Sequence, residues 1–128
     1  MFKALTKSVM WTKLAAFCLV FLVCTAAVWQ DTQQYNVTKT AASYTTVVSD
    51  YYIGVTSTAA ARTISTTAED QLKGRVVVLK DESNAAGTNN ITFDPAGAVT
   101  VDGAATKVIS TNSGALRLIC DGTNWFSF

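Results

Sequence analysis

Apolar and polar residues alternate in short runs from residue 43 to the end of the chain, most regularly over 74–128, and Gly, Asn or Asp separates most runs. The runs are rich in β-branched and aromatic side chains, which favour strands over helices. The pattern predicts about eight or nine short strands joined by turns. We therefore expect an all-β fold, either a small antiparallel sandwich or a prism-like domain.

Two pairs of neighbouring runs are predicted to form hairpins. The first pair comprises residues 44–48 and 51–56, with a turn at residues 49–50. The second pair comprises residues 107–110 and 115–120. Both pairs favour strands that run antiparallel within one sheet.

Turn chemistry marks the ends of several runs. Residues 94–97 (Asp-Pro-Ala-Gly) and 102–103 (Asp-Gly) carry residue types that tight turns require. Residues 67–73 are predicted to form a single helical turn with Thr67 as its N-cap, which is too short to be an independent helix.

Strand alternation also predicts which side chains enter the core. Residues 76–79 form a continuous apolar run, which is typical of a strand covered on both faces. Leu116, Leu118 and Cys120 share one face of their strand, and Arg117 points the other way. We therefore expect Cys120 to be a buried thiol rather than a nucleophile.

The aromatic residues leave two interpretations open. Alternation would bury one of Tyr51 and Tyr52 and expose its neighbour, and the alternative is a sugar-stacking platform. Phe126 and Phe128 share a face and Trp125 takes the other. We expect these last aromatic residues to be buried in the core or against a neighbouring subunit, with a carbohydrate-binding surface as the alternative.

The first segment of the chain, residues 1–30, has a different pattern. Lysines precede an apolar run over 14–24, and small residues follow it. The segment is predicted to be one hydrophobic helix: a secretory signal cleaved near Ala27, a membrane anchor, or a helix that docks in an assembly. Residues 31–42 are then a linker or an edge strand, and residues 43–128 are the β-domain.

Charge changes the picture in one respect. The chain has 15% charged residues and a formal net charge of +1. Lys3, Lys7 and Lys13 supply three of the ten basic residues, so from residue 31 onward seven basic residues face nine acidic ones and the net charge is −2. No basic cluster appears, which excludes the electrostatic surface of a nucleic-acid-binding protein.

The residue types of catalytic and metal sites are scarce. The chain has no histidine, so a Ser-His-Asp arrangement cannot form. The carboxylates considered as a calcium site or a glycosidase pair all lie at predicted turns, where Asp is favoured for backbone reasons: Asp81, Glu82, Asp94, Asp102 and Asp121. We expect no catalytic, cofactor-binding or metal-binding residues, and a protein that is not an enzyme and needs no cofactor.

The last half of the chain, about residues 63–128, resembles a small β-domain at the C-terminal ends of tailed-phage virion proteins such as tail fibres, spikes and head fibres. Four pieces carry the resemblance: Gly74 with the strand ending in Lys80-Asp81, residues 87–91, residues 101–103, and residues 116–125. The resemblance implies a non-enzymatic structural module, usually trimeric, on the outside of a virion.

The leading hypothesis is a structural virion protein, of fibre, spike or decoration type, that forms a homotrimer and projects from the virion surface. Its expected partners are other virion or surface-assembly proteins and a receptor or glycan on the host surface. No nucleic acid is expected, and residues 1–30 would make any membrane contact. The alternative, motivated by residues 1–30, is a secreted or membrane-tethered bacterial surface protein that binds glycan or forms an extracellular β-rich filament.

Overall fold

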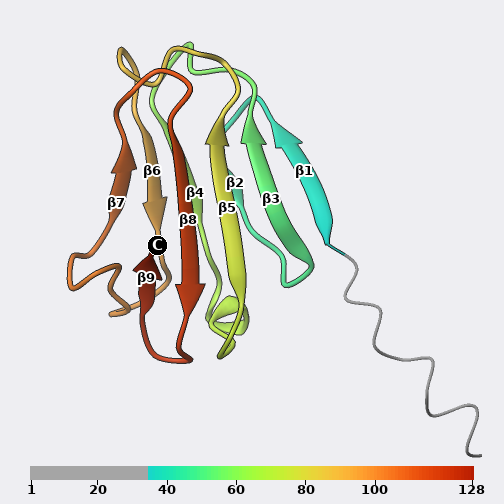
Figure 1. Cartoon of the computed structure of the whole chain (residues 1–128), viewed down its shortest axis with the longest axis vertical. Coiled ribbons are helices and arrows are strands. Elements are labelled where there is room, and N and C mark those ends of the chain that lie inside the picture. Colours follow the sequence, from blue (N-terminus) through green and yellow to red (C-terminus); the bar gives the residue numbers. More distant parts are fainter. Residues whose placement is uncertain (1–34) are drawn as a thin grey trace, which may run out of the picture. The chain divides into compact units, whose positions relative to one another are not determined.

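Nine strands in two sheets make up residues 35–128, the part of the chain that this computed structural model describes (Figure 1). The five-stranded sheet contains, in spatial order, β1 (Asn36–Thr40), β3 (Asp50–Val55), β5 (Val76–Asp81), β8 (Ala115–Cys120) and β9 (Trp125–Ser127). The four-stranded sheet contains β2 (Tyr44–Thr45), β4 (Arg62–Ser65), β6 (Ile91–Asp94) and β7 (Lys107–Ile109). The predicted β-sheet fold of short strands is confirmed.

The chain crosses from one sheet to the other after every strand from β1 to β5 (Figure 1). Successive strands of the same sheet therefore run parallel: β1 with β3 and β3 with β5 in one sheet, and β2 with β4 and β4 with β6 in the other. Each strand of the opposite sheet serves as the crossover that a parallel pair requires.

The last three strands pair antiparallel with their neighbours instead. Strand β7 pairs antiparallel with β6, β8 with β5, and β9 with β8. Both sheets are thus mixed, and the prediction of an antiparallel domain is wrong. The physical reason is that the turns between β1 and β6 are corners between sheets and do not fold a strand back onto its neighbour.

Both predicted hairpins are wrong for the same reason. Strand β2 pairs with β4, whereas β3 pairs with β1 and β5, so the runs at 44–48 and 51–56 lie in different sheets. The predicted turn does form, because the Asp50 amide donates to the Val47 carbonyl at 2.9 Å. Strands β7 and β8 likewise lie in different sheets.

Between the sheets lies a core to which both contribute. Its fully buried members include Ile53, Val77, Leu79 and Leu118 from the five-stranded sheet and Ile64, Ile91 and Phe93 from the other. The Trp125 ring is also fully buried and packs edge to face on Phe93, with ring centroids 5.4 Å apart. Burial of this apolar surface is the main term that holds the sheets together.

The alternation predicted for β8 is confirmed. Leu116, Leu118 and Cys120 are buried, and Arg117 is exposed on the opposite face. The prediction for β5 holds for one face only, since Val77 and Leu79 are fully buried but Val76 and Val78 are half-buried.

Three predicted local features are present. A 3-10 helix, η1 (Ala68–Asp70), follows Thr67 as predicted, and the Thr67 amide donates to the Asp70 carboxylate at 3.1 Å. Asp102 and Gly103 form a tight turn with φ angles of 51° and 83°, and this turn pairs Val101 with Ala104. Gly97, at the end of the turn after β6, has a φ of 72°, where glycine carries no steric penalty.

Strand β1 forms one edge of the five-stranded sheet, within the region 31–42 expected to be a linker or an edge strand. The predicted hydrophobic helix at residues 1–30, with its three interpretations, lies outside the described residues. Among the residues that are described, no helix has the length and apolar character needed to span a membrane.

Candidate interaction surface

The outward surfaces of the two sheets differ in chemistry. In the four-stranded sheet, the residues that alternate with the buried core residues are mainly hydroxyl-bearing or charged: Thr45, Thr63, Ser65, Thr92 and Asp94, with Val108 as the apolar exception. Side chains of this kind are readily hydrated, so this surface suits contact with water.

The outward surface of the five-stranded sheet is mainly apolar. Two cross-strand rows contain its apolar side chains, one formed by Val76, Ile119 and Phe126 and the other by Val37, Tyr52, Val78 and Phe128. In the second row the exposed Arg117 lies between Val78 and Phe128. We call the seven apolar and aromatic residues of the two rows the outer apolar face. Val37 is 59% exposed and Phe128 60% exposed, and Ile119 and Phe126 are also exposed. The prediction that Phe126 and Phe128 are buried in the core is therefore wrong, whereas a subunit contact stays a prediction.

Tyrosines extend this surface toward β1. The partner of β1 shifts from Asp50 to Tyr52 between adjacent residues, so Tyr51 is an extra residue in a β-bulge. Tyr51 and Tyr52 are both half-buried, and neither belongs to the core, which corrects the expectation that one of them points inward. The Tyr51 ring instead contacts Tyr35 edge to face, with centroids 4.5 Å apart.

An ion pair of Lys39 and Glu82 lies beside Tyr52 on the same surface. Lys39 Nζ donates to both Glu82 carboxylate oxygens at 2.5 and 2.6 Å, and the Tyr52 hydroxyl donates to Glu82 Oε1 at 2.7 Å. Burial and the hydrogen bond to Glu82 raise the pKa of Tyr52 to about 12. The bond from Lys39, followed by that from Tyr52, lowers the pKa of Glu82. The Glu82 carboxylate lies so close to Gly54 that a side chain there would displace it.

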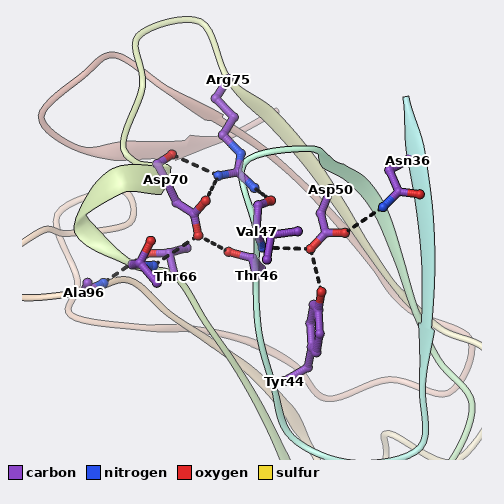
Figure 2. Close-up of polar contacts among 10 residues, drawn as sticks. Asn36, Tyr44, Thr46, Val47, Asp50, Thr66, Asp70, Arg75 and Ala96 are labelled. Atoms are coloured by element: carbon purple, nitrogen blue, oxygen red, sulfur yellow. Dashed lines mark hydrogen bonds and ion pairs between the residues drawn. The ribbon is translucent and has the colours of Figure 1, made fainter. Parts of the chain in front are cut away.

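The strongest polar cluster is buried and joins several loops (Figure 2). Asp70 accepts hydrogen bonds from Thr46 Oγ1 at 2.5 Å and from the Thr67 amide, and it forms an ion pair with Arg75. The Arg75 guanidinium also donates to the Val47 carbonyl at 2.7 Å. Burial acts to raise the pKa of Asp70, but the hydrogen bonds from Thr46, Thr67 and Arg75 outweigh it and leave the pKa below 3.8.

Asp50 organises the neighbouring corner (Figure 2). Its carboxylate accepts from Thr38 Oγ1 at 2.5 Å, the Tyr44 hydroxyl at 3.0 Å and the Val47 amide at 2.9 Å. Burial, followed by the bond to Asp50, raises the pKa of Tyr44. Because Thr38 lies on β1 and Tyr44 on β2, this carboxylate links the first strands of the two sheets.

The sequence pattern does not predict this pair of buried carboxylates as an organising cluster. It predicts a turn at Asp50 and places Asp70 within a short helical turn, with no further role for either. The spacing of Thr67 and Asp70 is the sequence signal for the capping contact. The contacts to Thr46 and Val47 have no local signal, since Thr46 lies 24 residues before Asp70 and Val47 lies 28 residues before Arg75.

The carboxylates considered as a calcium site or a glycosidase pair do not gather into one site, and those of Asp81, Asp102 and Asp121 bind loop and strand groups of the chain. Asp81 accepts from the amides of Ser83, Ala85, Ala86 and Ser113. Burial acts against its ionisation, but these bonds and the Ser83 hydroxyl lower its pKa to about 2.

The other candidates have similar roles. Asp102 accepts from Lys107 Nζ at 2.5 Å and from the Ser127 amide at 2.9 Å, which hold its pKa at about 2. Asp121 accepts from the amides of Thr123 and Asn124, and these bonds lower its pKa. Asp94 is exposed at the end of β6. Within residues 35–128, no group of three Asp, Glu, Cys or His side chains is placed to hold a metal ion.

Cys120 is buried, as predicted, and its sulfur accepts a hydrogen bond from the Gly122 amide at 3.3 Å.

Comparisons with protein-family models and with curated protein sequences gave no match for this chain. The chemistry of the described residues therefore carries the functional argument, and its most distinctive feature is the outer apolar face.

Proposed function

We propose that this chain is a structural virion protein of the fibre, spike or decoration type that oligomerises and projects from the particle surface. One observation carries the proposal: the buried carboxylates hold the chain's own loops together, while an exposed sheet surface is apolar and aromatic. Exposed apolar surface of this kind marks contact with other proteins. The resemblance of residues 63–128 to phage appendage domains gives the assembly its type.

The expected setting follows from the same proposal. The β-domain lies on the outside of the particle, contacts other virion proteins and meets the host receptor. Residues 1–30 attach it, through either a lipid layer or a docking site in the particle. The domain acts by binding and needs no cofactor.

Mass spectrometry of particles purified from cells that express the chain from its native locus tests this function. We expect its peptides in the particle fraction at a constant ratio to the main structural protein. Absence from the particles would overturn the virion assignment, whatever the chain does in solution.

A second candidate is a secreted or membrane-tethered bacterial surface protein that binds glycan. The specific observation in its favour is that Tyr35, Tyr51 and Tyr52 lie together at one end of the outer apolar face. Aromatic rings on a surface can stack on sugars. Recovery of the chain from the medium with an N-terminus near Val28, together with glycan binding that Tyr51→Ala abolishes, would favour this candidate.

A further inference from the structure

The outer apolar face extends across the whole five-stranded sheet. Its residues come from β1, β3, β5, β8 and β9, which are neighbours in that order. The register aligns Val76 with Ile119 and Ile119 with Phe126, so the row is unbroken from β5 to β9. The face is therefore one continuous surface rather than scattered exposed residues.

The sequence of β5 fits a sheet that is covered on both sides. Its inward residues Val77 and Leu79 are fully buried, and its outward residues Val76 and Val78 are also valines. Strands that read as continuous apolar runs are typically covered on both faces. The inner surface is covered by the other sheet, so the outer surface is the one that lacks a cover among the described residues.

The basic side chains on this surface already have partners within the chain. Lys39 pairs with Glu82 at 2.5 Å, and Lys80 Nζ donates to the Ser113 carbonyl. The Arg117 guanidinium lies over the Phe128 ring, 4.6 Å from its centroid. Lys39 therefore has a counter-ion, whereas a carbonyl and an aromatic ring are the partners of Lys80 and Arg117, so desolvation of these two cations would weaken contact with another apolar surface.

The size of the surface fits a small, reversible contact. Neighbouring strands lie about 4.8 Å apart and residues rise about 3.3 Å each, so five strands of up to six residues span roughly 24 by 20 Å. That is on the order of 500 Å² per copy, or about 1,000 Å² for two copies, which is near the threshold for a biological interface and below the roughly 1,200–2,000 Å² of stable ones.

We propose that a second copy of this chain covers the outer apolar face, through the same face of its own five-stranded sheet. A sheet face is its own complement, since a symmetric contact buries the same residues on both sides and two sheets pack about 10 Å apart. The inference rests on the proposed function in that the partner is another copy of the same appendage, and because the contact is twofold it closes a dimer in place of the trimer that the resemblance implies.

A glycan fits this surface less well. The polar groups beside the Tyr52 ring include Glu82, Lys39 and the Tyr52 hydroxyl, and these three are bonded to one another. Sugar hydroxyls, which need placed polar partners for specificity, would have to compete with these bonds. A sheet face is also not the concave site that small ligands occupy.

The test measures self-association of the full-length chain by sedimentation equilibrium, with the same mild non-ionic detergent in every sample. Ile119→Lys and Phe126→Lys place a charge on the face. Val108→Lys is the matched control, because Val108 is 44% exposed and Phe126 43% exposed but Val108 belongs to the other sheet. Phe128→Ala is a milder variant that follows β9 and adds no charge. Circular dichroism establishes that each variant is folded.

We expect a reversible wild-type oligomer. Ile119→Lys and Phe126→Lys should raise its dissociation constant by at least about tenfold and Phe128→Ala by several-fold, as for central interface residues. Val108→Lys should leave the dissociation constant within about twofold. A monomeric wild type, equal weakening by Val108→Lys, or unchanged association of the folded outer-face variants would overturn the inference. Glycan binding by a monomeric chain would assign the surface to a sugar instead.

The outcome is separable from that of the proposed function. Association that depends on Ile119 and Phe126, in a chain that is absent from particles, upholds the interface and overturns the virion role. If the chain is found in particles but both substitutions leave its self-association unchanged, the virion role is upheld and the interface is overturned.

Discussion

At the scale of single residues, the ion pair of Asp70 and Arg75 is the most consequential contact in the described domain. The Asp70 side chain is fully buried and that of Arg75 is 6% exposed. Their bonds reach the β2–β3 corner through Thr46 and Val47 (Figure 2). A buried pair of this kind contributes little net stability by itself, but removal of one partner leaves an uncompensated charge.

Asp70→Asn should therefore lower the free energy of unfolding by about 3–5 kcal/mol, because Arg75 stays buried without its counter-ion. Urea denaturation followed by tryptophan fluorescence measures this change. Asp94→Asn is the control, since Asp94 is exposed at the end of β6, and its effect should be within about 0.5 kcal/mol. Equal effects of the two substitutions would contradict a structural role for the buried pair.

Asp81 makes stability depend on pH. Its hydrogen bonds lower its pKa in the folded chain to about 2, from an ordinary value of 3.8. The folded state thus favours the ionised carboxylate, and the stabilisation is complete above about pH 4 and lost as the pH falls toward 2. A shift of this size corresponds to about 2 kcal/mol.

Urea midpoints measured from pH 5 to pH 2 check this prediction. Wild type should lose stability across that range, and Asp81→Asn should be less stable at pH 5 and show a smaller decline. The lowered pKa values of Asp70 and Asp102 act in the same direction, so the variant keeps part of the slope. A variant with the wild-type slope would show that Asp81 does not titrate as described.

At the scale of elements, alternation identified strands well and their partners poorly. The inward face of β8 and the position of η1 followed from local pattern and capping chemistry. The hairpins failed because a turn such as Val47–Asp50 fixes a change of direction but not the sheet that the next strand joins. That choice depends on contacts between strands far apart in the chain, such as β3 with β5.

The candidate surface shows the same limit. Sequence alternation placed Phe126 and Phe128 on one face and Trp125 on the other, which is correct. It did not show that Val37 and Tyr52 share the surface with them, because the five-strand order aligns these residues and no local signal encodes that order. The bulge at Tyr51 changes the direction of one tyrosine, and alternation alone cannot predict it.

At the scale of the whole molecule, residues 34–128 form a compact unit by themselves. Their core, the Asp50 and Asp70 clusters and the outer apolar face all lie within that unit. The domain thus contains the contacts that explain its fold, and the proposed interface requires nothing from residues 1–33. The proposed attachment through residues 1–30 and the proposed self-association through the outer apolar face can therefore be tested separately.

A truncated chain that begins at residue 34 should therefore fold with a urea midpoint close to that of the full-length chain. It should also self-associate without detergent and lose that association on Phe126→Lys, because both halves of the proposed contact remain. Denaturation and sedimentation equilibrium of the two lengths measure this. If truncation abolished association but left the midpoint unchanged, residues 1–33 would be the assembly element and the sheet surface would have another partner.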